Sequence, residues 1–230
     1  MSGRAGRACA VCGEPARPPF RAPQPEIAPD LDMRPGEPTR STLADWIQTC
    51  RSCGAVGPDL AALPASAASV VRSDAYRALG MESAEETLPF RRWAMIARAA
   101  GDDAAAAEAL LQAGWAADDA AAVSEAAALR REVAAAWASA RDAETGLRRL
   151  DVLRRAGAFE EATTWAAALA AMPLDETARL VLAFQQARIA ERDIGRHLIS
   201  RALPPPAHAP HVSHGRRERT GLWTRLFRRS

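Results

Sequence analysis

Cys9-Ala10-Val11-Cys12 and Cys50-Arg51-Ser52-Cys53 are the two stretches that decide the fold of this chain. A glycine follows each pair at once, Gly13 or Gly54. The Cys-x-x-Cys spacing lets two thiolates reach one ion, and glycine supplies the left-handed turn that aims backbone N–H groups at the sulfurs. Two such pairs complete a tetrahedral shell. The sequence therefore predicts a structural Zn²⁺ bound by Cys9, Cys12, Cys50 and Cys53.

The start of the chain bears on the redox state of these cysteines. No apolar stretch precedes the first pair, so residues 1–7 show no secretory signal. No window reaches the roughly twenty apolar residues of a membrane span. We therefore expect a cytoplasmic protein with reduced thiols, which favours a metal over the alternative of free or disulfide-bonded cysteines.

The segment between the two pairs is unusually long for a zinc ribbon. Thirty-seven residues separate Cys12 from Cys50, against the usual spacing of about 15–20. Proline is incompatible with helix or central strand, so an extended excursion is predicted. Six prolines in the first half of the segment carry this prediction: Pro15, Pro18, Pro19, Pro23, Pro25 and Pro29. Trp46 and Ile47 predict a short strand that enters the second pair.

The rest of the chain is rich in alanine, the best helix former. Residues 65–79 have a helical composition with a break near Ser73, and Gly80 predicts the end of that helix. Apolar residues then recur at helical spacing. We expect amphipathic helices around 90–97, 106–113, 122–137, 147–153, 159–169 and 178–189, and a short last helix over 194–202.

Two segments of this helical region resemble copies of each other. Residues 96–106 superimpose on residues 152–162, and in both a glycine (Gly101 or Gly157) is followed five positions later by an alanine (Ala106 or Ala162). Glycine permits a tight turn between helices, and the small alanine lets the second helix pack closely. The pattern predicts a mainly α fold with a tetratricopeptide-like antiparallel helical array behind the zinc-ribbon-like head.

Composition divides the chain into three parts. Residues 1–60 are predicted to form the head with its Pro-rich insertion, residues 61–203 the helical domain, and residues 204–230 a Pro/His/Arg-rich tail that is disordered in isolation. The net charge is +2, but six arginines and one glutamate give residues 216–230 a charge of +5.

The tail carries apolar residues at helical spacing among its arginines. Such a face suits an anionic membrane surface or an acidic partner groove, with weak binding because the stretch is short. A solubilising disordered end is the alternative. The candidate contact residues are Trp223, Arg225, Phe227 and Arg228.

The stretch Pro29-Asp30-Leu31-Asp32-Met33-Arg34-Pro35, followed by Trp46-Ile47-Gln48-Thr49-Cys50, resembles a group of uncharacterised bacterial proteins. These are the DUF2225-type proteins and their relatives, which combine a four-cysteine zinc-ribbon-like head with tetratricopeptide-like helices. The resemblance covers most of residues 9–200. It implies zinc at the four cysteines and implies no reaction. The chain departs from the pattern at Arg51 and Ala55, where relatives carry proline and an aromatic residue.

Two further groups of polar residues are candidates for function. Asp30, Asp32, Arg34 and Arg40 lie between the cysteine pairs, where they could contact a ligand or form internal ion pairs that fix the loop, and the second interpretation is preferred. The carboxylate pairs 102–103 and 118–119 are each predicted to begin a helix, where aspartate caps free N–H groups.

These observations favour a protein-binding adaptor or scaffold, stabilised by zinc and using a groove between helices for an unknown protein partner. A nucleic-acid-associated zinc-ribbon protein with a basic tail is the alternative. Charge disfavours it, because residues 1–60 hold seven arginines against seven acidic residues. An enzyme ranks third, since no catalytic constellation is visible. The sequence leaves the oligomeric state open.

Overall fold

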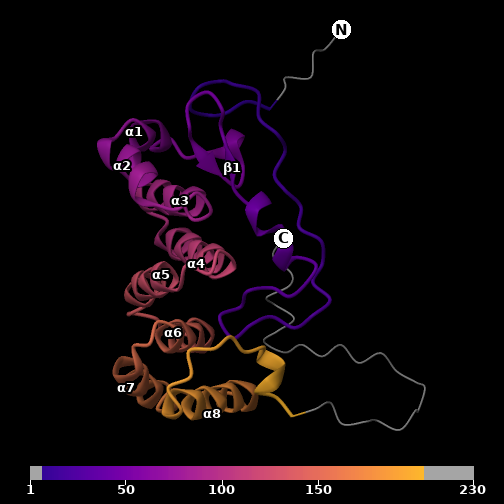
Figure 1. The fold of residues 1–230 in the computed structure, drawn as a ribbon, viewed down its shortest axis with the longest axis vertical. Coiled ribbons are helices and arrows are strands. Elements are labelled where there is room, and N and C mark those ends of the chain that lie inside the picture. Colours follow the sequence, from indigo (N-terminus) through magenta and orange to yellow (C-terminus); the bar gives the residue numbers. More distant parts are fainter. Residues whose placement is uncertain (1–6, 205–230) are drawn as a thin grey trace, which may run out of the picture.

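The computed structural model describes residues 7–204, and the predicted mainly α fold is confirmed (Figure 1). Two short antiparallel strands, β1 (Gln48–Thr49) and β2 (Val56–Gly57), pair Gln48 with Gly57 and Thr49 with Val56. The helices are α1 (Ala67–Val71), α2 (Asp74–Glu82), α3 (Leu88–Ala99), α4 (Asp103–Asp119), α5 (Val123–Ala136), α6 (Ala143–Arg155), α7 (Phe159–Ala170) and α8 (Glu176–Ala190). Three 3-10 turns complete the fold: η1 (Arg40–Asp45), η2 (Leu60–Ala62) and η3 (Ile199–Arg201).

The helices from α3 to α8 form a stacked array in which each packs on the next, and α6 also contacts α8. Alanine makes this packing close. In α4 the buried residues include Ala106, Ala109, Ala113 and Ala117, so neighbouring backbones approach without large side chains between them. No helix within residues 7–204 is long and apolar enough to cross a membrane.

The two predicted glycine turns are equivalent in the structure. Gly101 has φ 78° and Gly157 has φ 71°, the left-handed conformation that glycine adopts without strain. In each turn the N–H of the residue after glycine reaches back to a helix carbonyl: Asp102 to Ala97 and Ala158 to Leu153, both at 3.0 Å. The following alanines, Ala106 and Ala162, are both buried. The predicted equivalence of the two copies is therefore confirmed.

Two more helices end in the same turn without glycine. Ala121 after α4 has φ 56°, and Arg192 after α8 has φ 53°. The N–H of Ala122 bonds the carbonyl of Ala117 at 2.8 Å, and that of Asp193 bonds Arg188 at 2.9 Å. The sequence did not predict these turns because neither position carries glycine.

Two of the expected helix ends are wrong. Ser73 does divide the first helical region, because its hydroxyl accepts from the N–H of Tyr76 as the N-cap of α2. However, α2 continues through Gly80 to Glu82. The last predicted helix, 194–202, is only the 3-10 turn Ile199–Arg201, because Gly195 interrupts it and the chain there pairs with another segment.

That other segment is the strap, residues 29–40, in the middle of the Pro-rich excursion. It runs along one side of the helical stack (Figure 1), where Asp30 forms a β-bridge with Leu198. The N–H of Leu31 bonds the carbonyl of His197 at 3.0 Å, and Ile199 bonds the carbonyl of Pro29 at 2.9 Å. One hydrophobic core cluster contains residues from Cys9 to Ile199, so head, strap and array share buried contacts.

Candidate metal centre

Two turns with the same hydrogen bonds present the cysteines. In the first knuckle, residues 9–14, the N–H of Gly13 bonds the carbonyl of Cys9 at 2.8 Å, and the N–H of Cys9 bonds the carbonyl of Glu14 at 2.7 Å. In the second, residues 50–55, Gly54 and Cys50 repeat both bonds at 2.9 and 2.8 Å. Both glycines have positive φ, 79° and 73°, as their position after each pair predicts.

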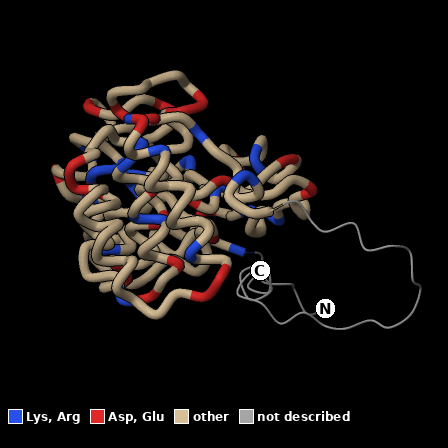
Figure 2. Tube along the Cα trace, turned by 90° about the horizontal axis from the view of Figure 1, so that it is seen from below, with Lys and Arg blue, Asp and Glu red and all other residues tan. Residues whose placement is uncertain are grey.

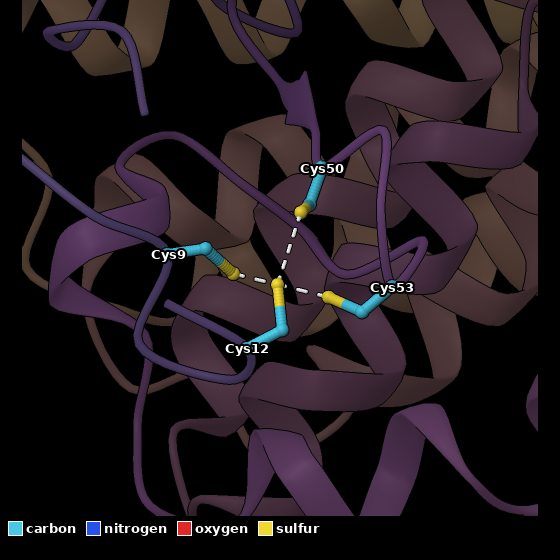
Figure 3. Close-up of side chains that lie close together, drawn as sticks. All are labelled: Cys9, Cys12, Cys50 and Cys53. Carbon is cyan, nitrogen blue, oxygen red and sulfur yellow. Dashed lines mark hydrogen bonds between the residues drawn. The ribbon is translucent and has the colours of Figure 1, made fainter. Parts of the chain in front are cut away.

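The knuckles bring all four thiols together (Figure 3). Their Sγ atoms lie within 4.8 Å of one another, with Cys12 and Cys50 3.5 Å apart and Cys9 and Cys53 3.9 Å apart. Cys9 and Cys50 are buried, Cys53 is half-buried, and Cys12 is exposed. This cluster could hold a metal ion, as the sequence predicts.

The four thiols differ in their readiness to ionise. Burial raises the pKa of Cys53 to about 12 and also raises that of Cys9. Burial acts the same way on Cys50, but the backbone N–H groups of Cys53 and Ser52 favour its thiolate and bring its pKa down to about 7. A bound cation is the group that would let all four sulfurs ionise together.

Contacts with the array hold the second knuckle in place. The hydroxyl of Tyr76 in α2 donates to the carbonyl of Gly54 at 2.8 Å. Burial raises the pKa of Tyr76 to about 12, so this hydroxyl stays a donor. Gln48 in β1 donates to the carbonyls of Pro18 and Pro58, both at 3.1 Å, which ties the excursion to the head.

The first knuckle is anchored next to the second. The N–H of Ala10 bonds the carbonyl of Leu60 in η2 at 2.9 Å. Arg7 forms an ion pair with Asp59, whose other oxygen caps η2 by accepting from the N–H of Ala61 at 3.0 Å. The Arg7 hydrogen bond holds the pKa of Asp59 below its usual range.

Asp30 and Arg40, two of the candidate contact residues, pair with each other inside the strap. Both terminal nitrogens of Arg40 donate to one oxygen of Asp30, at 2.8 and 2.9 Å. Asp30 is buried, and this burial raises its pKa despite the guanidinium. The pair fixes the strap against the start of η1.

Asp32 lies at the centre of a buried polar network. Its carboxylate accepts from Arg155 in α6 at 3.0 Å and from the indole N–H of Trp115 in α4 at 2.9 Å. Its backbone carbonyl accepts from Arg148 at 3.2 Å. Burial acts to raise the pKa of Asp32, but Arg155 and Arg130 outweigh it and hold that pKa below its usual range.

Arg34 and the carboxylates at the end of α4 extend the network. Arg34 donates to the carbonyl of Trp115 at 3.3 Å and forms an ion pair with Asp119. Asp118 accepts from Arg155 at 2.6 Å and from both terminal nitrogens of Arg130. The predicted helix-capping role is confirmed for Asp102, which caps α4 through the N–H of Ala105.

The same prediction is wrong for residues 118–119, which end α4 instead of beginning a helix. A carboxylate is unfavourable at the negative end of a helix dipole, so the paired arginines offset it here. Sequence reasoning also missed the arginines of α6. They occupy the polar positions of an amphipathic helix, yet α6 is enclosed by α5, α7, α8 and the strap, so these side chains are buried in ion pairs.

An open groove lies between the last two helices. It has a volume of about 510 Å³ and is bordered by Phe159 and Ala166 of α7 and Ile189 of α8, with Glu160 and Arg192 at its rim. Ala167 and Ala190 also line it, and both are exposed. The predicted tail contact residues Trp223, Arg225, Phe227 and Arg228 lie outside the described part of the chain.

Charged positions are interspersed along the described body, with arginine and acidic positions close together in the array (Figure 2). The fold and the site together define a mainly helical protein with a candidate four-thiol metal centre. Comparison with known protein families, curated proteins and solved structures found no match to this chain.

Proposed function

We propose that this chain is a zinc-stabilised adaptor that binds a helical segment of a partner protein. The proposal has two parts: a structural Zn²⁺ in the four-thiol cluster, and a partner site in the α7–α8 groove. The observation that carries the first part is the separation of the Sγ atoms, and the observation that carries the second is the open groove at the end of the array.

The sulfur positions support zinc. Zn–S bonds of about 2.3 Å in a tetrahedron place sulfurs ~3.8 Å apart. Two pairs of sulfurs lie 3.5 and 3.9 Å apart and all four lie within 4.8 Å of one another, so the cluster is close to the dimensions of such a shell. Four thiolates also leave no coordination position for water or substrate, which favours a structural role for the metal over a catalytic one.

The groove supports a helical partner. Arrays of this kind bury each helix against its neighbours, and the last pair has a face where a further helix would pack. Phe159 and Ile189 provide apolar contact there, and the alanines on both helices allow a close approach. Glu160 and Arg192 at the rim suit a partner helix with charges of both signs along its edges. The amphipathic helix-in-groove mode of recognition requires these features.

Substitutions in the groove test the adaptor function. The double variant Ala167→Arg/Ala190→Arg fills the groove with two exposed, charged side chains without changing the core. The matched control is Ala168→Arg/Ala187→Arg, at exposed positions of the same helices that do not line the groove. Proteins captured from cells by the tagged wild-type chain are identified, and the retained one is titrated as a purified protein.

The expected result is a single partner whose Kd rises at least tenfold for the groove variant and stays within twofold for the control. A partner that binds both variants equally contradicts the groove. A partner lost on nuclease treatment or in moderate salt contradicts the adaptor function and favours the basic tail as the binding element.

A further inference from the structure

A second groove lies where the strap meets the array, and we name it the η1 groove. It has a volume of about 310 Å³ and lies between η1, the start of α3 and the end of α4. Leu43, Phe90 and Ala116 form its apolar lining. Glu86 and Asp119 lie at its rim, and both are exposed.

The rim of the η1 groove is acidic because Arg40, the one basic residue among those that line it, already pairs with Asp30. Arg40 lines the groove, but its guanidinium is directed to the buried Asp30. Asp119 pairs with Arg34 and still has 55% of its side chain exposed. Within residues 7–204, Glu86 forms no ion pair, and its side chain is exposed. An apolar floor with an acidic rim fits a segment that combines large apolar residues with arginines.

The end of this chain has that composition. Within residues 219–229 the apolar residues fall at a spacing that places them on one face of a helix: Leu222, Trp223, Leu226 and Phe227. The arginines around them are Arg219, Arg225, Arg228 and Arg229. We propose that residues 219–229 dock into the η1 groove of their own chain, with an aromatic side chain on the apolar floor and arginines at Glu86 and Asp119.

The path of the chain allows this contact. Leu198 pairs with Asp30, and Asp30 bonds Arg40, which lines the groove. The last described segment is therefore connected to the η1 groove through a single residue, Asp30. Residues 205–218 form the connection, and fourteen residues reach up to ~46 Å when extended. The connection is long enough from any point of the surface near residue 204.

This contact does not involve the α7–α8 groove, so its test is independent of the test of the adaptor proposal. It also gives the basic tail a function within the chain. A tail held at the η1 groove is withdrawn from phosphates and from anionic membrane surfaces, which the same arginines would otherwise attract.

Hydrogen exchange of the full-length, zinc-loaded chain tests the contact. Docking predicts that the amides of residues 220–229 exchange at least tenfold more slowly than in a synthetic peptide of residues 217–230. The groove variant Glu86→Arg/Ala120→Arg reverses one rim charge and places a second arginine at an exposed lining position. It should bring the exchange rates to within twofold of those of the peptide. The control, Glu85→Arg, makes the same charge change at the adjacent position outside the groove and should keep the protection.

Four results would overturn the proposal. Exchange of the tail at the peptide rate in the wild-type chain means that it is not docked. Protection that is equal in the groove variant and the control places the tail elsewhere. Protection that grows with protein concentration assigns the groove to the tail of a second copy. Protection that requires vesicles of phosphatidylglycerol and phosphatidylcholine assigns the tail to a membrane surface.

Discussion

Arg155 in α6 donates a hydrogen bond to Asp32 in the strap, 3.0 Å away and 123 positions earlier in the chain. Both side chains are buried, and Asp32 is completely inaccessible. The pair thus joins the loop closed by the four cysteines to the middle of the helical array. The four-thiol cluster and the array are linked through this contact as well as through their shared apolar core.

Asp32→Ala should destabilise the protein strongly. It leaves the guanidinium of Arg155 in a buried site with only Asp118 as its partner and removes the acceptor of the Trp115 indole. Removing one member of a buried pair costs about 3–5 kcal/mol. Urea unfolding followed by circular dichroism measures this cost. As a control, Arg77→Ala removes an exposed pair with Asp74 and should cost about 0–1 kcal/mol. Equal costs for the two variants would show that the buried pair is not needed for stability.

The pH dependence of stability should carry the signature of Asp32. The pKa of Asp32 in the folded state is below the usual value. Between the folded and the unfolded pKa, Asp32 is therefore ionised in the folded chain and protonated in the unfolded chain. The resulting stabilisation is complete above the unfolded pKa of about 3.9 and is lost as the pH falls through the folded pKa. The Asp32→Asn variant has no carboxylate at this position and therefore lacks this pH-dependent stabilisation. The difference in unfolding free energy between wild type and Asp32→Asn should be constant from pH 5 to 7 and shrink below pH 4. A difference that grows in acid would contradict the direction of the pKa shift.

The local features of the fold were predictable because their chemistry is encoded in adjacent residues. Each cysteine pair with its glycine specifies a knuckle, and the two glycine turns specify helix ends with left-handed backbone. The preferred interpretation of Asp30 and Asp32, internal ion pairing, agrees with the partners that the structure places beside them. The partner of Asp32 was not predictable, because helical periodicity assigns Arg155 to a solvated face and contains no information on what packs there.

Two other features escaped sequence reasoning for related reasons. Asp118 has the residue type of a helix start, and only the distant Arg130 and Arg155 make it acceptable at a helix end. Ala121 adopts a left-handed turn conformation, which a sequence indicates only when the residue is glycine. The strain of this conformation is offset by the packing of α4 on α5. Both cases depend on tertiary contacts that override local preference.

Metal removal should destabilise the whole described fold and not only the head. If the head and the helices were independent units, Cys12→Ser or Cys53→Ser would unfold the head and leave the helices intact. The shared core and the strap contacts instead predict one cooperative transition that shifts with the metal. Zinc at a thousandfold excess over its Kd contributes about 4 kcal/mol to stability. Urea unfolding with and without a chelator measures this contribution.

The controls separate metal loss from other effects. Ser52→Ala changes an exposed residue between two cysteines and should keep one zinc per chain, measured by elemental analysis, with an unchanged unfolding midpoint. Cys53→Ser should lose the metal and respond no further to chelator. Two resolved transitions in the metal-free chain, with the helical signal lost only in the second, would instead show that the head and the helical array unfold as separate units.

The turn after α4 offers a substitution that should stabilise the protein. Ala121 has φ 56°, where an L-residue with a Cβ is strained by about 1 kcal/mol. Ala121→Gly relieves this strain and should raise the unfolding free energy by about 0.5–1 kcal/mol, although glycine gives the unfolded chain more entropy to lose. The opposite change, Gly157→Ala, places a Cβ at φ 71° in the equivalent turn and should cost about 1 kcal/mol.

The reason for this contrast is backbone conformation and not space, because a Cβ at Gly157 would meet no atom within 4 Å. Ala183→Gly, at an exposed position within α8, is the control, since glycine inside a helix should lower stability by about 0.5–1 kcal/mol. Urea unfolding of the three variants under identical zinc concentration compares them directly. A gain for Ala121→Gly together with losses for the other two assigns the effect to the left-handed turn. A loss in all three would mean that unfolded-state entropy and not native strain dominates at residue 121.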